Sequence, residues 1–337
     1  MVEGSKIEWT DHTFNPWIGC QKVAPECDHC YAESQNLRWH NGTNWGPKAP
    51  RKRTASAYWR APLRWNAAAD AFAAEHGRRQ RVFCASLADV FDNAVPPEWR
   101  SDLWALIEAT PQLDWLLLTQ RAGNIAKMLP DSWGAGWANV ALGVTAGTLA
   151  TAKRDIPILQ ATPAARRFVS MEPLLERVDI CAELGIWWNQ TTGQWVRERD
   201  HGLHQIIVGG ESGTGARPMH PLWAKSLRDQ AAAAGVPFLF KQWGEWKPVS
   251  DMTDAEADAM YTPAPERKPL ASRASRFAQI VLTNGGNSLR PNDPDAWKGT
   301  GSMLMFRVGK SRAGRELDRQ LHDGFMPAVE PRERIPT

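Results

Sequence analysis

The feature that most constrains this sequence is a repeated pairing of a short apolar run with an amphipathic segment between residues 81 and 242. The apolar runs are continuous rather than alternating, which is typical of strands buried on both faces of a parallel sheet. Alternating β and α segments favour right-handed crossovers and an α/β fold. The predicted strands are Val82–Leu87, Trp115–Thr119, Val140–Thr145, Arg167–Met171, Gln205–Gly209 and Pro237–Lys241.

A further strand is expected near Phe14–Gly19, before the series begins. Together these strands favour a mainly parallel (β/α) barrel, partial or complete and TIM-like, over a doubly wound sheet. No G-x-G-x-x-G turn follows the first strand, which removes the main argument for a dinucleotide-binding fold. Apolar stripes predict helices over Trp99–Ile107, Ile125–Leu129 and Pro221–Ala234, the last with Gly235 as its C-terminal cap.

The β–α pattern ends at Trp246, so the chain divides into a barrel domain, residues 1–246, and a C-terminal extension, residues 247–337. Two stretches interrupt the barrel: residues 33–61 read as a loop, and residues 186–203 as a surface insertion. The extension is expected to be partly irregular. Within it we predict a strand at Phe277–Leu282 and a terminal basic amphipathic helix at Gly309–Leu321.

The composition excludes several classes of protein. No apolar run approaches the roughly 20 residues that a membrane span needs, and the first residues carry no apolar leader. We therefore expect a cytoplasmic protein with no membrane partner. The net charge is +3, too close to balance to imply a nucleic-acid partner by itself. Five cysteines argue against a disulfide framework.

Three of the five cysteines form the motif Cys20-x6-Cys27-x2-Cys30. Thiolates at such spacing hold either zinc or an iron–sulfur cluster. Zinc requires a fourth ligand, which a nearby histidine could supply, whereas three thiolates leave a [4Fe–4S] cluster with one open iron. Spacing alone leaves both metals open. Position favours the cluster, because the motif follows the first strand, at the barrel end that usually carries the chemistry. The remaining two, Cys84 and Cys181, are expected to be small buried side chains.

An early stretch combines basic and aromatic side chains, as a groove for single-stranded nucleic acid does. An ordinary solvated loop and helix face explains the same pattern. The basic residues are Lys48, Arg51, Lys52, Arg53, Arg60 and Arg64, and the aromatic residues are Trp45, Tyr58, Trp59 and Trp65.

Several longer stretches carry a family resemblance across most of the chain. They are Ile7-Glu8-Trp9-Thr10, Phe14-Asn15-Pro16-Trp17-Ile18-Gly19-Cys20, Cys27-Asp28-His29-Cys30-Tyr31-Ala32, Ser86-Leu87-Ala88-Asp89-Val90-Phe91, Leu118-Thr119-Gln120-Arg121, Ser170-Met171-Glu172-Pro173-Leu174, Val208-Gly209-Gly210-Glu211-Ser212-Gly213, Phe240-Lys241-Gln242-Trp243-Gly244 and Val308-Gly309-Lys310. In these stretches the sequence resembles the radical S-adenosylmethionine (SAM)-like phage Gp37/Gp68 proteins. The resemblance implies a radical SAM-like barrel that binds a [4Fe–4S] cluster and SAM. It also implies a phage or prophage context, with the three-Cys-motif partner protein as a partner.

The residues that follow the predicted strands are the candidate site, because strand ends face the mouth of such a barrel. Glu172, Lys241 and Arg121 are the candidate catalytic residues, since each displays a charge there. Arg121 would clamp a carboxylate or phosphate, and a surface ion pair is the alternative. Trp243 would stack on a base or pack at the rim.

The candidate cofactor-binding residues are polar side chains and glycines in the same positions. By the radical SAM resemblance, Ser86 and Asp89 would contact the SAM amino group, although Asp89 also suits a helix N-cap. The paired glycines would let the backbone approach a ligand, and Glu211 would bind ribose hydroxyls. The full set is Tyr31, Ser86, Asp89, Thr119, Gly209, Gly210, Glu211 and Ser212, with Cys20, Cys27 and Cys30 as metal ligands.

The sequence thus predicts a radical SAM-type iron–sulfur enzyme of phage or prophage origin that modifies or repairs a nucleic acid or nucleotide. The alternatives are a zinc-stabilised nucleic-acid-binding protein without catalysis, and a cluster-bearing partner subunit.

Overall fold

A seven-stranded parallel sheet forms the centre of the computed structural model, which describes residues 4–5, 7–198, 200–263, 273–299 and 301–328. The strands are β1 (His12–Phe14), β4 (Gln80–Cys84), β5 (Leu113–Thr119), β6 (Val140–Thr145), β7 (Arg166–Met171), β10 (Gln205–Gly209) and β11 (Phe238–Gln242). Each of the last six pairs in parallel with the strand before it in this list. The α/β prediction is confirmed.

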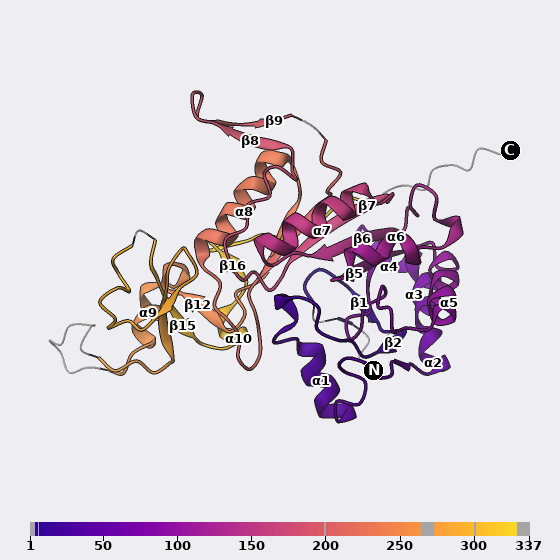
Figure 1. Ribbon diagram of the computed structural model, residues 1–337, viewed down its shortest axis with the longest axis horizontal. Coiled ribbons are helices and arrows are strands. Elements are labelled where there is room, and N and C mark those ends of the chain that lie inside the picture. Colours follow the sequence, from indigo (N-terminus) through magenta and orange to yellow (C-terminus); the bar gives the residue numbers. More distant parts are fainter. Residues whose placement is uncertain (1–3, 6, 199, 264–272, 300, 329–337) are drawn as a thin grey trace.

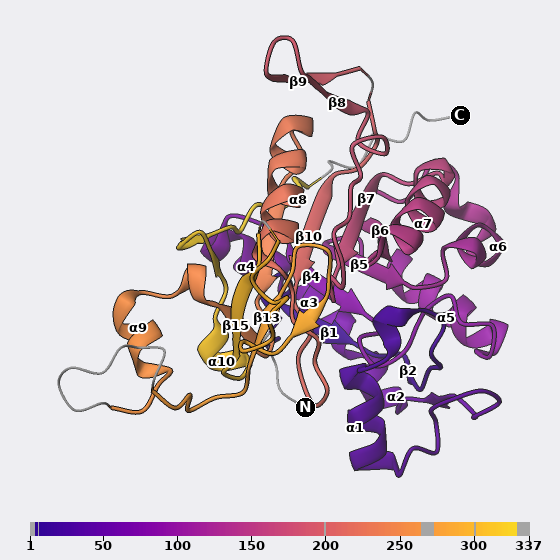
Figure 2. The same ribbon diagram turned by 60° about the vertical axis from the view of Figure 1, so that its left-hand side comes forward.

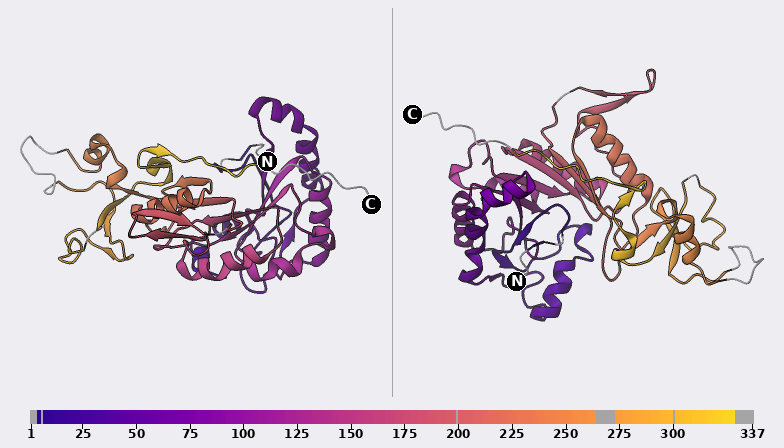
Figure 3. Two further views of the ribbon diagram at one scale, coloured as in Figure 1. Left: turned by 90° about the horizontal axis from the view of Figure 1, so that it is seen from above. Right: turned by 180° about the vertical axis from the view of Figure 1, so that it is seen from behind.

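The strand order in the sheet follows the chain, without the reversal that a doubly wound sheet requires. β1 and β11 are the two edges, so the sheet curls into an open half-barrel rather than a closed barrel (Figure 3). Of the two predicted forms, partial and complete, the partial one is found.

Helices cover the convex face of the sheet (Figures 1 and 3). Right-handed crossovers without a reversal place them on one side. They are α3 (Ala61–Ala67), α4 (Ala69–His76), α5 (Pro97–Glu108), α6 (Ile125–Met128), α7 (Leu149–Ala161) and α8 (Pro221–Ala234), with single 3-10 turns at Ala122–Asn124 and Asp131–Trp133. As predicted, α8 ends at Gly235, whose φ of +68° suits a glycine cap.

Successive strand residues supply two separate apolar layers. On β5, Trp115 and Leu117 belong to the large cluster under the helices, whereas Leu116 belongs to a smaller cluster inside the curl. A strand buried on both faces must be apolar at every position, which explains the continuous runs. On β6, Gly143 leaves room for the Phe168 ring, because a Cβ there would lie 2.3 Å from it.

Residues from both chain ends fill the inside of the curl. Trp9 packs 4.6 Å from Phe83, centroid to centroid, and Met326 belongs to the same inner cluster. A segment after residue 314 runs along the edge of β11, where the backbone N–H of Phe240 donates to the carbonyl of His322 at 2.9 Å. The open side of the half-barrel is therefore covered by the chain itself.

Residues after β11 form a second, smaller layer on the left of Figure 1. Its antiparallel sheet has the order β12 (Trp246–Pro248), β15 (Met303–Arg307), β13 (Gln279–Leu282) and β14 (Ser288–Leu289). A 3-10 turn at Val249–Asp251 and helix α9 (Asp254–Ala259) flank it. The predicted strand over Phe277–Leu282 is confirmed as β13.

The predicted terminal helix over Gly309–Leu321 is wrong beyond its first turn. Only α10 (Lys310–Ala313) forms, because Gly314 at φ +77° ends it. Asp318 and Arg319 then take positive φ values in the turn of a hairpin made by β16 (Glu316–Leu317) and β17 (Gln320–Leu321).

Both interruptions of the barrel contain secondary structure. Residues 186–203 contain a hairpin of β8 (Ile186–Asn189) and β9 (Gln194–Arg197) that projects from the molecule (Figure 2). Residues 33–61 are not a plain loop: they hold most of α1 (Tyr31–His40), together with β3 (Lys52–Arg53) and α2 (Ser56–Trp59). β3 pairs with β2 (Trp17–Ile18). Within the described ranges, no helix has the length and hydropathy to cross a bilayer.

Candidate functional site

A cavity of about 400 Å³ lies at the carboxyl ends of the parallel strands, where (β/α) folds carry their sites. It opens between the cysteine loop, residues 20–30, and the ends of β4, β5, β6, β7, β10 and β11. Its inner wall is apolar, with Trp9, Phe83 and Leu118 among its residues. The volume is within the range of small-molecule sites.

The structure brings nearly all of the predicted site residues to this cavity. The lining residues from that set are Cys20, Cys27, Cys30, Tyr31, Ser86, Asp89, Arg121, Glu172, Gly210, Glu211, Ser212 and Lys241. The other two, Thr119 and Gly209, lie just behind the wall: Thr119 Oγ1 donates to Asp89 at 2.8 Å, and Gly209 packs against Glu172.

The three cysteines reach the cavity from different local structures. Cys20 follows β2, Cys27 ends the 3-10 turn Pro25–Cys27, and Cys30 is the N-cap residue of α1. Burial, followed by the charge of Asp89, raises the pKa of Cys20 to about 12. Burial also raises the pKa of Cys27 and Cys30, against the backbone amides that lower it. All three are free thiols that must lose protons to bind a metal.

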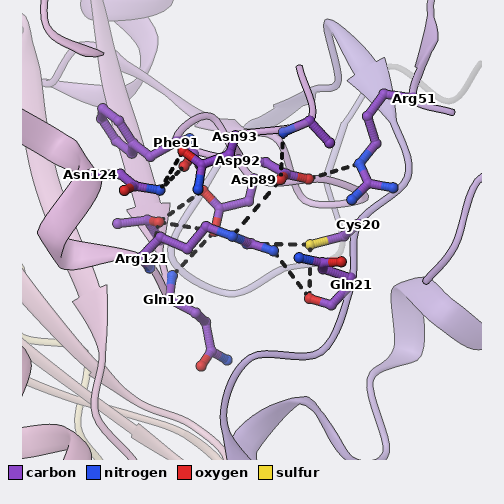
Figure 4. Close-up of polar contacts among 12 residues, drawn as sticks. Cys20, Gln21, Arg51, Asp89, Phe91, Asp92, Asn93, Gln120, Arg121 and Asn124 are labelled. Atoms are coloured by element: carbon purple, nitrogen blue, oxygen red, sulfur yellow. Dashed lines mark hydrogen bonds and ion pairs between the residues drawn. The ribbon is translucent and has the colours of Figure 1, made fainter. Parts of the chain in front are cut away.

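Arg121, at the end of β5, connects the sheet to the cysteine loop (Figure 4). Its Nη1 lies 2.7 Å from Asp89 Oδ2 and 3.5 Å from Cys20 Sγ, while Nη2 donates to the carbonyl of Gln21 at 3.1 Å. The guanidinium and Asp89 are both largely buried. Asp89 also accepts from Thr119 Oγ1 and from backbone amides, including that of Phe91. Both charges are thus already paired inside the protein.

Arg217 makes a second connection to the same loop, from the segment after β10. Its side chain forms a two-point ion pair with Glu211, at 2.9 Å from Nε and 2.6 Å from Nη2. The same guanidinium donates to the carbonyl of Pro25 at 2.9 Å and lies 3.1 Å from Asp28. Glu211 therefore orients Arg217, and Arg217 holds the turn that precedes Cys27.

Glu26 makes the third connection, from the loop outward. It is 4% exposed, and its Oε1 accepts from the backbone amides of Gly147 and Thr148 and from Thr151 Oγ1. A carboxylate is favourable at the N-terminus of a helix such as α7. Gly147 permits this approach, because a Cβ there would lie 2.9 Å from Glu26 Cγ, and 1.9 Å from the carbonyl oxygen of Pro173. Glu26 Oε2 is buried without a hydrogen-bond partner among the described residues.

Glu172 and Lys241 form an ion pair of 2.8 Å across the mouth, and Gln242 Nε2 donates to the same carboxylate oxygen at 3.0 Å. The two residues come from β7 and β11, on either side of β10. Gly209 of β10 makes room for them, since a Cβ there would lie 3.1 Å from the Glu172 side chain. Both charges line the cavity and are partly exposed, so this pair is open to a ligand in a way that Asp89 is not.

Tyr31 and Ser86 join α1 to the end of β4. The Tyr31 hydroxyl donates to the carbonyl of Ser86 at 2.7 Å. Asn15 amide Nδ2 donates to Ser86 Oγ at 3.1 Å, and Asn15 Oδ1 accepts from the amide of Leu87. The side chains of Tyr31 and Ser86 therefore hold the rim in shape as well as lining it.

Several polar residues that line this cavity were not predicted as ligand contacts: Gln21, Glu26, Gln120, Thr145, Ser170, Gln242 and Lys310. Glu26 lies between the cysteines, where the predicted metal ligands were the thiols, with a nearby histidine such as His29 as the fourth ligand of a zinc ion. Lys310 comes from the C-terminal extension, and its family-like Val308-Gly309-Lys310 stretch was the available signal. Arg217 was not among the predicted site residues, because its contacts depend on a loop conformation that local sequence does not determine.

Three thiols that line one cavity are a donor set that suits an iron–sulfur cluster. In the described part of the chain, no three His, Cys, Asp or Glu side chains gather around one point that a metal ion could occupy. The three cysteines do line one cavity, and a cubane takes each thiolate on a different iron. Tetrahedral zinc instead needs its ligands around a single centre.

The predicted basic groove does not form as expected. Arg51 is buried, and its Nε lies 2.7 Å from Asp92 with both side chains 1% exposed. Tyr58 and Trp59 pack against Phe14, and Trp65 stacks on His12 at 4.1 Å. These aromatic rings support the sheet edge rather than offering a stacking face.

Two further side chains have structural roles. Trp243 is 1% exposed and donates from Nε1 to the carbonyl of Glu316, so it packs at the rim. Cys84 is buried in β4, as expected, whereas Cys181 is half-buried outside the cavity.

Comparison with known proteins gives a family. No curated protein and no solved structure matches the chain. One family model matches residues 4–327, which is nearly the whole chain and includes both the half-barrel and the C-terminal layer. The chain therefore belongs to the family described as "Protein of unknown function (DUF5131)".

Proposed function

We propose that this protein is a radical SAM-type iron–sulfur enzyme, with a [4Fe–4S] cluster on Cys20, Cys27 and Cys30, that acts on a nucleic acid or nucleotide. The observation that carries the proposal is that three cysteines and the polar residues of six strand ends line one cavity. A TIM-like, radical SAM-like ancestry of the half-barrel and a cytoplasmic location, where thiols stay reduced, belong to the same proposal.

Cys20, Cys27 and Cys30 would hold the cluster, which, when reduced by an external one-electron donor, would supply the one-electron chemistry for cleavage of SAM. The chain's own contribution is to hold the three thiols. Arg121, Arg217 and Glu26 each fix one part of the cysteine loop to a different strand end. Because these three contacts order the cysteine loop before any ligand binds, less conformational entropy of the loop is lost when the ligand binds.

Some charged residues at the cavity are paired inside the protein and others face the cavity, which suggests which of them contact SAM or the substrate. Asp89 and Glu211 are each paired with an arginine, so their role is to position the loop. Glu172 and Lys241 face the cavity and would hold or move a proton at the substrate. The backbone of Gly210 and the side chains of Ser212 and Gln242 remain for SAM or the substrate.

The inner wall would protect a reactive species. Trp9, Phe83 and Leu118 close the cavity from the inside of the curl, and an apolar wall excludes water from the reacting atoms. The resemblance to the phage Gp37/Gp68 proteins adds the three-Cys-motif partner protein as a proposed partner.

Anaerobic purification of the full chain with iron, sulfide and zinc analysis tests this function. We expect a brown protein that absorbs near 400 nm, with about four irons per chain. Replacing Cys20, Cys27 or Cys30 by Ala should each abolish the colour, while Cys181→Ala, a half-buried thiol outside the cavity, should retain it. A colourless protein with one zinc would establish the alternative, a zinc-stabilised nucleic-acid-binding protein without catalysis. Calorimetric titration of SAM into the brown protein then separates an enzyme from a cluster-bearing partner subunit.

A further inference from the structure

We infer that a single-stranded nucleic acid binds across the C-terminal layer, along a basic surface formed by Arg276, Lys310 and Arg312, and reaches the cysteine cavity past Lys310. This inference rests on the proposed function for what happens in the cavity. It assigns the substrate surface to a part of the molecule different from the one the sequence suggested.

Three adjoining hollows form the path. The first, of about 320 Å³, lies in the C-terminal layer, and Arg276, Phe277 and Arg312 are among its lining residues. The second lies over the loop from Val308 to Arg312. Val308 and Arg312 line both of these hollows, and Lys310 lines both the second hollow and the cysteine cavity. The hollows therefore meet, residue by residue, at this loop.

The charge of this path is positive and unpaired. Arg276, Lys310 and Arg312 are exposed, and no described carboxylate forms an ion pair with any of them. Lys247 also lines the first hollow, but it is paired with Glu256 at 2.9 Å. Arg273, outside the path, is likewise paired, with Asp258. Three cations left free beside one path are suited to successive phosphates.

The path also offers a planar surface for bases. The Arg312 guanidinium lies over the Phe277 ring, 5.1 Å from its centroid, and both residues line the first hollow. Guanidinium planes and aromatic rings are the stacking platforms of single-strand binders. A protein segment with acidic side chains would use the cations but not this stack.

The cysteine cavity at the end of the path favours a single strand over a duplex. The cysteine cavity, about 400 Å³, lies at the carboxyl ends of the strands and is bordered by the cysteine loop. A base inside a duplex must leave its stack to enter such a cavity, whereas a single strand presents it directly.

Fluorescence anisotropy with a labelled 20-nucleotide single strand, as DNA and as RNA, tests the inference on the full-length protein purified without oxygen. The test variant is Arg276→Ala, Lys310→Ala and Arg312→Ala together. The matched control removes three exposed cations from the opposite end of the molecule, Lys52→Ala, Arg60→Ala and Arg64→Ala (Figure 1).

We expect the wild-type protein to bind one of the two strands with an affinity that falls with salt. The test variant should bind about tenfold more weakly near 100 mM salt, and its slope of log K against log salt should flatten by about 2, as loss of three single-strand phosphate contacts implies. The control should retain wild-type affinity and slope. Thermal unfolding of all three proteins checks that the variants fold.

Four results would overturn the inference: no binding of either strand, an unchanged test variant, an equal loss in the control, or equally tight binding of polyglutamate of matched charge, which would indicate an acidic protein partner. A duplex that binds as tightly as the single strand overturns the choice of strand. Iron measured in the same samples separates the two proposals. If the protein binds the strand but contains no iron, the binding surface is supported and the iron–sulfur enzyme is overturned. If it contains iron but binds no strand, the enzyme is supported and the binding surface is overturned.

Discussion

Arg121 places its Nη1 3.5 Å from the sulfur of Cys20, although 101 positions separate the two residues in the chain. The same nitrogen is ion-paired with Asp89, which itself raises the pKa of Cys20. The arginine lowers that pKa and so favours the thiolate that a metal requires. This contact makes the ionisation of Cys20, a proposed cluster ligand, depend on a residue that follows a strand of the sheet.

The first prediction concerns this ionisation in the metal-free protein. Burial and Asp89 hold the pKa of Cys20 at about 12, so its alkylation by iodoacetamide should keep rising with pH up to about 11. Arg121→Gln removes the opposing charge and should move the profile to higher pH. Mass spectrometry of the Cys20 peptide gives the profile, and the same chain in denaturant is the control, with an ordinary thiol profile.

A profile that levels off near pH 9 in the folded protein would contradict this expectation. The sign for stability follows from the raised pKa. The folded state binds the thiol proton more tightly than the unfolded state, so this contribution is complete below about pH 9 and is lost as the pH rises through the folded value. Metal loading releases the proton and should strengthen with pH.

The second prediction concerns Arg51 and Asp92, which the structure pairs inside the protein. Asp92→Asn keeps the size of the side chain but leaves a buried guanidinium without its counter-charge. We expect a loss of about 3–5 kcal/mol in the free energy of unfolding, measured by urea denaturation. Asp102→Asn is the control, because its pair with Arg53 is largely solvent-exposed and should cost less than about 1 kcal/mol. Equal losses in the two variants would show that Arg51 is not held as described.

The third prediction compares two carboxylates at the start of α7. Glu26 is buried and accepts three hydrogen bonds there, whereas Glu176 is exposed and accepts one, from the amide of Leu149. Glu26→Ala should therefore cost about 2–4 kcal/mol, because it leaves buried donors unpaired, and Glu176→Ala less than about 1 kcal/mol. Hydrogen exchange should also speed up across residues 20–30 in Glu26→Ala only. Unchanged exchange would mean that the loop does not depend on Glu26.

Much of the fold could be predicted because a parallel strand that is buried on both faces appears in the sequence as a continuous apolar run. On β5, Trp115, Leu116 and Leu117 are all apolar since both faces are covered. The closure of the sheet could not be predicted in this way. Whether β1 meets β11 depends on curl accumulated over the whole sheet, and here residues of the C-terminal segment occupy that gap.

The candidate site, like the fold, could be predicted only in part. The ends of the predicted strands placed both Glu172 and Lys241 at the barrel mouth; their ion pair was not predicted. The partners of Asp89 and Glu211 could not be foreseen, because they come from loops whose conformation is set by distant contacts. The basic composition of residues 48–64 suggested a nucleic-acid groove, but Arg51 is buried and paired with Asp92.

The placement of Met326 beside Trp9 inside the curl has a consequence for biosynthesis. A ribosome delivers all seven strands of the sheet before it delivers this methionine, so the nascent half-barrel must wait with its concave face uncovered. The inner apolar cluster is therefore completed only after the whole sheet has been synthesised, because Met326 joins Trp9 and Phe83 there.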